Sequence, residues 1–162
     1  METIEKVTPV THLSIKLKND FEKFTTAFQN LAGKITKEDL DNIAKDPEGA
    51  RKHIETLQGY QGLMIFNITE HGALLALAGQ KRFARQYMLG NPLFALSMTK
   101  HDIRAAIYAP LKVLVYVNDQ NETFVEYDKP SDQFGQFGVA EITEFALGLD
   151  EKVSKLIAKA DE

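Results

Sequence analysis

A β-hairpin at residues 111–128 is the feature of this sequence that most constrains its fold. Residues 111–117 (LKVLVYV) are rich in Val, Leu and Tyr, and they form the strongest strand pattern in the chain. Residues 118–121 (NDQN) have the composition of a turn. Residues 122–128 (ETFVEYD) follow, with Thr, Val and Tyr on one face. The sequence therefore predicts an antiparallel strand pair at this place.

Three other segments have strand patterns. Residues 12–18 alternate between apolar and polar side chains, as do residues 82–89, and residues 63–68 form a short apolar run that predicts a buried strand. Two strand–helix–strand units follow from this, 63–89 and 82–117. Their connections are long enough for parallel pairing, so we expect parallel neighbours in the sheet.

Apolar residues at helical spacing predict four helices, at 21–31, 70–78, 92–98 and 139–158. Asn19 or Asp20 can cap the first helix, Thr69 the second and Asn91 the third. The last helix carries a full apolar stripe, so it is predicted to be an amphipathic C-terminal helix. Residues 129–138, rich in Gly, Ser, Asp and Gln, are expected to form a loop.

These elements predict an α+β fold, with a mixed β-sheet of about five strands and helices packed on it. We expect residues 1–162 to form a single domain, because the sequence contains no repeat and no inter-domain linker. Residues 34–59 are highly charged and only thinly apolar. They are predicted to form two short, mostly exposed helices that start at Thr36 and Asp46.

Composition excludes several classes of function. The chain has 162 residues, a net charge of −4 and no cysteine. The absence of cysteine removes disulfides, thiolate zinc sites, iron–sulfur clusters and cysteine nucleophiles. No basic stripe favours nucleic acid, and the four histidines lack metal-binding spacing. The N-terminus lacks a signal-peptide pattern, and no apolar run approaches the roughly 18 residues of a membrane span, so a cytoplasmic location is expected.

Two short motifs lie where a ligand site is plausible. Glu70 and His71 follow one predicted strand, and Gly90 and Asn91 follow the next. A helix start presents free backbone N–H groups and a partial positive charge. If the two strands are parallel, both helix starts open on one edge of the sheet and favour an anionic or polar ligand.

A purely structural interpretation of each residue is also open. Gly90 can be a turn glycine, Asn91 an N-cap and Pro92 the first residue of a helix. His71 near a helix start needs no function, and Glu70 can complement the helix dipole. No complete nucleophilic triad, metal motif or phosphate loop appears in the sequence, so no catalytic residue, metal or cofactor is predicted.

The order and spacing of four short motifs resemble those of the domain-of-unknown-function-302 (DUF302) family. The motifs are residues 70–71 (EH) after a strand, residues 89–92 (LGNP) at the end of the next strand, residues 110–112 (PLK) entering the hairpin, and Tyr127. Members of the family usually have Asp at the position of Glu70.

The resemblance spans residues 10–33 and 62–160. It implies a small α/β protein without an established activity, and it implies a homodimer. It also implies that residues 34–59 are a helical insertion relative to shorter members. Four aromatic and methionine residues are candidates for a buried dimer patch: Met98, Tyr108, Phe134 and Phe137.

Three functions remain open at this point. The leading hypothesis is a non-enzymatic domain that binds or senses a small anionic or polar ligand through Glu70, His71, Gly90 and Asn91. The second is an acid–base enzyme that uses His71. The third is a structural or dimerisation protein with no ligand.

Overall fold

The computed structural model describes residues 1–41 and 43–162. In these residues a six-stranded sheet organises the fold, with strand order β1-β6-β5-β4-β3-β2. The strands are β1 (His12–Lys16), β2 (Gly33–Lys34), β3 (Met64–Glu70), β4 (Ala84–Gly90), β5 (Leu111–Val117) and β6 (Thr123–Asp128).

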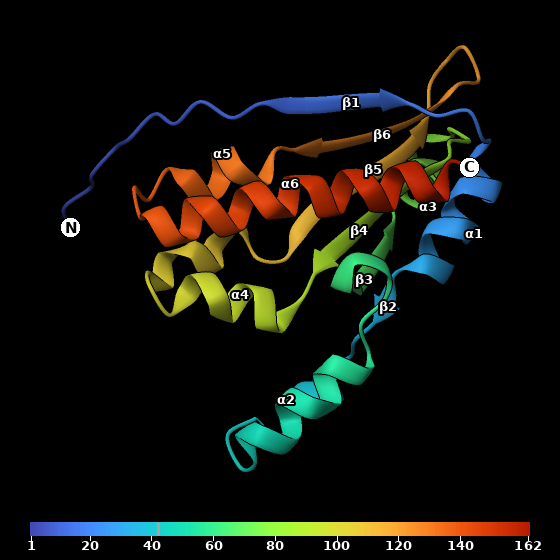
Figure 1. Ribbon diagram of the computed structural model, residues 1–162. Coiled ribbons are helices and arrows are strands. Elements are labelled where there is room, and N and C mark those ends of the chain that lie inside the picture. The colour runs from blue at the N-terminus through green and yellow to red at the C-terminus, as the bar shows by residue number, and fades with distance from the viewer. Residues whose placement is uncertain (42) are drawn as a thin grey trace.

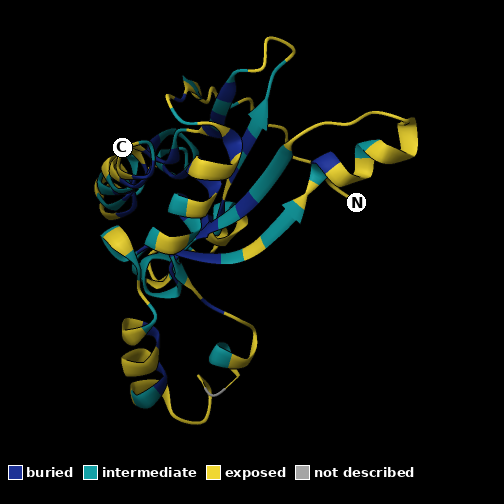
Figure 2. Cartoon of the chain, turned by 90° about the vertical axis from the view of Figure 1, so that its right-hand side faces the viewer, coloured by how far each residue is buried: buried dark blue, intermediate teal, exposed yellow. Residues whose placement is uncertain are grey.

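Helices cover one face of the sheet, and the opposite face is largely open (Figures 1 and 2). The α-helices are α1 (Phe21–Leu31), α2 (Pro47–Thr56), α3 (His71–Leu74), α4 (Pro92–Thr99), α5 (Pro130–Gly135) and α6 (Ala140–Ala160). Short 3₁₀ helices complete the chain: η1 (Glu38–Leu40), η2 (Tyr60–Gly62), η3 (Leu75–Ala78) and η4 (Ile103–Tyr108). The predicted α+β class, single domain and long C-terminal helix are confirmed, with one strand more than expected.

The main core lies between the sheet and the helical layer. Phe24 and Phe28 of α1 are fully buried, and the Phe28 ring lies 5.0 Å from that of Tyr87 in β4. Asp20 caps α1 by accepting a 2.8 Å hydrogen bond from the Lys23 N–H. Full burial of a phenylalanine side chain contributes about 1.5–3 kcal/mol to the stability of the fold. The apolar residues at helical spacing in 21–31 therefore mark the face of α1 that is buried against the sheet.

The predicted direction of the strands is wrong. β3 pairs antiparallel with β4, and β4 pairs antiparallel with β5. The short α3–η3 segment turns back instead of crossing the sheet. Hydrophobic pattern and connection length permit both directions, and neither encodes which one the chain takes. Only the two-residue strand β2 pairs in parallel, with β3, in the described residues.

Two local predictions also fail. Thr69 was expected to cap a helix, but β3 continues through it to Glu70. The expected loop at 129–138 contains α5, which begins with Pro130 at its first position. Asp150 of α6 accepts a 2.9 Å hydrogen bond from the Ser131 N–H, which fixes the start of α5 against α6. The composition of residues 129–138 cannot predict a hydrogen bond to a residue of a distant helix.

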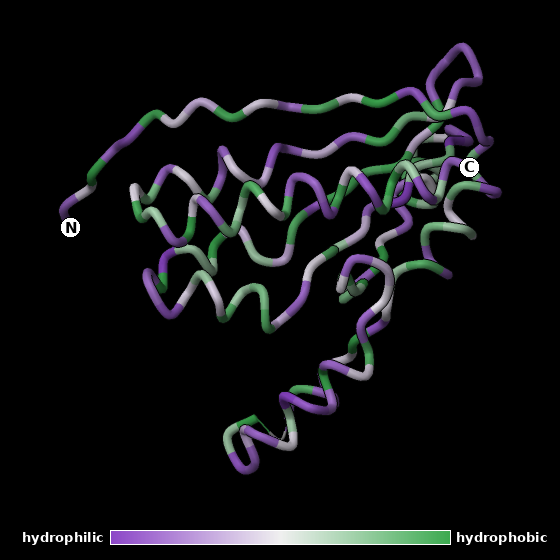
Figure 3. Tube along the Cα trace, viewed as in Figure 1, coloured by the Kyte–Doolittle hydropathy of each residue, from purple (hydrophilic) through white to green (hydrophobic). Residues whose placement is uncertain are grey.

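Residues 34–59, here called the arm, extend away from the body of the protein (Figure 1). The first of its two predicted helices is only the three-residue η1, and the second is α2, capped by Asp46 as expected. Thr36 does not cap a helix and instead donates to Asp39 at 2.8 Å. Hydrophilic residues predominate on α2 (Figure 3). Its buried Ile54 packs in a small second cluster with Ile35 and Met64.

The two ends of the arm cross at a pair of glycines. The N–H groups of Gly33 and Gly59 both donate to the Leu63 carbonyl, at 2.9 and 3.3 Å. A Cβ atom on Gly59 would lie 2.0 Å from the Gly33 nitrogen and 2.4 Å from the Leu31 oxygen. The backbones therefore approach more closely than any side chain at either position allows.

Candidate functional site

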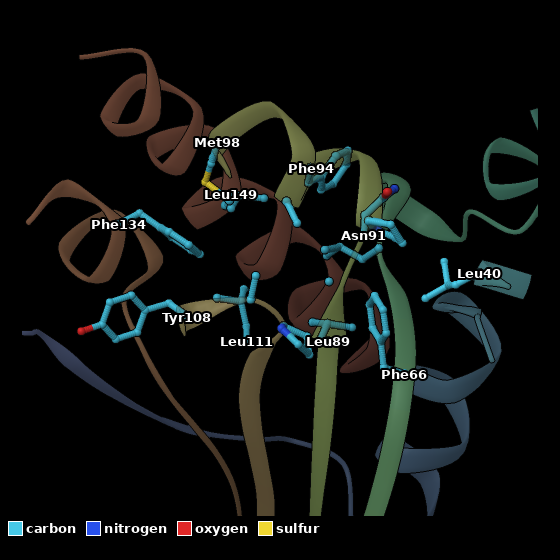
Figure 4. Close-up of a pocket in the computed structure, with 16 residues that line it drawn as sticks. Leu40, Phe66, Leu89, Asn91, Phe94, Met98, Tyr108, Leu111, Phe134 and Leu149 are labelled. Atoms are coloured by element: carbon cyan, nitrogen blue, oxygen red, sulfur yellow. The ribbon is translucent and has the colours of Figure 1, made fainter. Parts of the chain in front are cut away.

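A cavity lies at the end of the sheet where β4 leads into α4 (Figure 4). Its volume is about 140 Å³, and sixteen residues line it. Most of them are apolar, and they include Phe66, Leu89, Phe94, Tyr108 and Phe134. The Tyr108 hydroxyl points away from the other lining side chains (Figure 4). The cavity is therefore an apolar space between the strand ends and the helical layer.

Asn91 is the polar side chain that reaches the cavity, and its polar atoms are already paired. The residue is 3% exposed. Its Oδ1 accepts a 2.8 Å hydrogen bond from the Leu93 N–H, and its Nδ2 donates to the Gly62 carbonyl at 2.8 Å. Asn91 and Pro92 thus start α4 as an N-cap and a first-turn proline, as the sequence predicts. Asn91 therefore joins α4 to η2, the short helix that follows the arm.

The four predicted site residues do not come together. Gly90 and Asn91 line the cavity, but Glu70 and His71 lie at the other end of β3. In the β3–β4 ladder Met64 is opposite Gly90 and Glu70 is opposite Arg85. Six residues of strand separate the two ends by about 20 Å. The expectation of one shared cleft is wrong, because it depended on parallel strands.

Glu70 belongs instead to a polar network beneath α1. It forms an ion pair with Arg85, whose guanidinium lies 5.2 Å from the centre of the Phe21 ring. Gln29 of α1 donates a 3.0 Å hydrogen bond to the Tyr87 hydroxyl, and burial raises the pKa of Tyr87. This network fastens α1 to the sheet. His71 is half-buried at the start of the four-residue α3.

A second polar cluster lies on the open face of the sheet, centred on His12 of the edge strand β1. Its Nδ1 lies 2.8 Å from Asp128, and its Nε2 lies 3.3 Å from Glu126. Hydrogen bonds to Asp128 and then Glu126 raise the pKa of His12. Glu126 also accepts a 2.7 Å hydrogen bond from Tyr116. With both ring nitrogens engaged by carboxylates, the imidazole has no free lone pair for a base, so the cluster fits cross-strand pairing.

Sequence reasoning missed the aromatic lining of the cavity. The sequence predicts that Phe94 lies on the helix that starts at Pro92 and that Phe134 and Tyr108 belong to a dimer patch. The structure corrects this assignment, because Phe134 and Met98 are 1% and 2% exposed and Tyr108 packs on Phe134 and Phe137. No local signal distinguishes an aromatic residue that lines a cavity from one that fills a core.

Neither a metal site nor a membrane-spanning helix is found in the part of the chain that the structure describes. Within residues 1–41 and 43–162, no group of three or more His, Asp or Glu residues is arranged to hold a metal ion. No described helix has the length and apolar character needed to cross a membrane.

Comparisons with known proteins agree with the fold. The family model for the domain of unknown function DUF302 matches residues 41–160. The chain is also similar to the crystal structure of an uncharacterized conserved DUF302 protein from Bacillus stearothermophilus, with a TM-score of 0.66 and 12% identity. That similarity covers 92% of this chain and 97% of the other, and at this identity it shows the fold alone. No curated protein matches the chain. Since the family model covers most of its length, this chain belongs to the DUF302 family.

Proposed function

We propose that this protein binds a small molecule through an apolar group that enters the cavity beside Gly90 and Asn91. The observation that carries the proposal is a space of about 140 Å³ with an almost wholly apolar lining. A cavity of about 150 Å³ lined by Leu, Ile and Phe stays dry and binds benzene. The space here has that size and chemistry, so an apolar ligand gains contacts that water cannot make.

The character of the cavity changes the expected class of ligand. An anionic or polar ligand was expected from two helix starts at one cleft, but only α4 begins here. The first-turn cap at Asn91 already satisfies the Leu93 N–H. Burying a polar group without a partner costs roughly 1–3 kcal/mol in proteins. The part of the ligand inside the cavity is therefore apolar.

The acid–base alternative loses its basis in this geometry. It required His71 to face the same space as Asn91, and His71 does not line the cavity. Among the described lining residues there is no histidine and no carboxylate to move a proton. We therefore favour binding over catalysis at this site.

The cavity can be tested with benzene and a filling substitution. Saturating benzene is expected to raise the unfolding temperature, because a ligand that binds only the folded state stabilises it. Ala95 of α4 lines the cavity, so Ala95→Leu should fill it and abolish this rise. Ala158→Leu, at an exposed position of α6, is the matched control and should keep the rise. A benzene-induced rise that survives in Ala95→Leu would place the ligand elsewhere.

A homodimer is a second proposal, and the open face of the sheet favours it. This face carries four half-buried apolar side chains, namely Met88, Leu114, Tyr116 and Phe124. The α3–η3 segment protrudes from the body of the protein (Figure 2). Its Leu74 and Leu77 side chains are 56% and 91% exposed. A protruding apolar segment next to the apolar part of this face suits a two-fold interface, in which one patch contacts its own copy.

Light scattering at tens of micromolar tests the dimer. We expect about twice the chain mass of 18.2 kDa for the natural sequence. Leu77→Lys should shift the mass toward a single chain, because it places a charge in the apolar contact. Leu147→Lys, at an exposed position of α6, should leave the mass unchanged. A mass of one chain for the natural sequence would rule the dimer out.

A further inference from the structure

An apolar groove of about 440 Å³ runs between the arm and α4, next to the cavity. Its arm side is formed by Ile43, Ala50 and Ile54, and its α4 side by Pro92, Leu93 and Leu96. Two of these side chains are large apolar groups left open to solvent, since Ile43 is 42% and Leu96 is 45% exposed. The groove is therefore an uncovered apolar surface of definite shape.

The groove and the cavity adjoin each other at the first turn of α4. Pro92 lines both spaces. On the arm, Leu40 lines the cavity and Ile43, three residues later, lines the groove. On α4 the cavity side carries Phe94, Ala95 and Met98 and the groove side Leu93 and Leu96, so an apolar chain too long for the cavity would reach the groove by passing over Pro92. The pair of spaces fits an elongated ligand better than a compact one.

Charge at the rim of the groove selects one end group for such a ligand. Arg51 of α2 lines the groove and is exposed. Its neighbour Lys52 pairs with Glu48 at 3.0 Å, whereas none of the ion pairs among the described residues involves Arg51. Glu48 also lines the rim, but Lys52 opposes its charge. A guanidinium matches the two oxygens of a carboxylate, so the rim is complementary to a carboxylate group.

We propose that the ligand is an aliphatic monocarboxylate, with its tail end in the cavity, its chain along the groove and its carboxylate at Arg51. The proposal rests on the proposed function and adds the ligand class to it. It joins three separate observations: an apolar cavity, a groove that meets it at Pro92, and a cation at the groove rim that forms no ion pair within residues 1–41 and 43–162.

Calorimetric titration with straight-chain carboxylates from butanoate to decanoate tests the shape of the site. Each methylene that enters the groove should tighten binding about fourfold, the equivalent of about 0.8 kcal/mol. Decanol, which has the chain without the charge, should bind about two- to fivefold more weakly than decanoate, as expected for an exposed ion pair. Raising the salt concentration should reduce that difference.

Matched variants separate the end group from the chain. Arg51→Gln should weaken decanoate about two- to fivefold and leave decanol unchanged, whereas Lys155→Gln, at an exposed position of α6 outside both spaces, should change neither. Leu96→Gln should weaken both decanoate and decanol severalfold without affecting benzene, because Leu96 lines the groove and not the cavity. Leu147→Gln, at a similarly exposed leucine outside both spaces, is its control.

The outcomes distinguish this proposal from the function on which it rests. If benzene binds in the cavity but affinity does not rise with chain length, the elongated ligand is wrong and the apolar cavity site stands. If chains bind equally well with and without the carboxylate, or Arg51→Gln has no effect, the assigned end group is wrong. If neither benzene nor decanoate binds, the proposed function fails together with this inference.

Discussion

Gly59→Ala is expected to lower the free energy of unfolding by about 4 kcal/mol or more, close to the whole stability of a marginal domain. The added Cβ would lie 2.0 Å from the Gly33 nitrogen, 2.4 Å from the Leu31 oxygen and 2.5 Å from the Ala32 carbonyl carbon. All three are backbone atoms, so no side chain can rotate to relieve the overlap. The crossing must open, and with it the hydrogen bonds of Gly33 and Gly59 to Leu63.

Chemical denaturation measures this effect, with Gly148→Ala as the matched control. Gly148 lies inside α6, and a Cβ atom there meets nothing within 4 Å. The same substitution should therefore stabilise the protein by about 0.5–1 kcal/mol, because alanine favours the helix. The two variants should move in opposite directions. A Gly59→Ala protein within 1 kcal/mol of the natural one would show that the two backbones do not approach so closely.

Asn91→Ala is the second large expected effect, at about 2–3 kcal/mol of lost stability. The substitution removes the N-cap of α4, which alone is worth about 0.5–2 kcal/mol. It also leaves the Gly62 carbonyl without its 2.8 Å donor and opens a gap beside the cavity. A loss of this size is expected from a nearly buried side chain that satisfies two backbone groups at once.

Two companion variants divide the contribution of Asn91. Asn91→Ser keeps a side-chain oxygen that can cap α4 and loses the donor to Gly62, so its stability should fall between those of the natural protein and Asn91→Ala. Asn67→Ala removes an exposed asparagine that donates a 3.1 Å hydrogen bond to Thr69, and it should change stability by less than about 0.5 kcal/mol. Thermal unfolding of all four proteins gives the comparison. Equal stabilities for Asn91→Ala and Asn67→Ala would refute the structural role of Asn91.

Local patterns predicted the elements of this fold well. The hairpin at 111–128, the phenylalanine face of α1 and the Asn91-Pro92 start of α4 are each encoded by neighbouring residues, and all three form as expected. Each depends on chemistry within one or two turns of chain: strand alternation, helical spacing or a cap.

The arrangement of those elements was not predictable in the same way. A strand has the same side-chain pattern in either direction, so the pattern of β4 could not exclude a parallel β3. The prediction of parallel strands therefore placed Glu70 and His71 at the same edge of the sheet as Gly90 and Asn91, whereas they lie at the opposite edge. The cavity was equally hidden, because its lining combines residues from η1, β3, β4, α4, η4, β5, α5 and α6, whose positions depend on that arrangement. The elements are local properties of the sequence, and the site is a property of their assembly.

The shared contact of Gly33 and Gly59 with the Leu63 carbonyl also bears on how this protein can evolve. A segment whose two ends already touch can be lengthened or shortened with little change in the entropy of closing it, about 0.6 kcal/mol for each doubling. Insertions and deletions within the arm therefore leave the sheet almost undisturbed. Substitutions at the two crossing glycines do disturb the sheet. Selection therefore acts on the length of the arm and on its attachment independently.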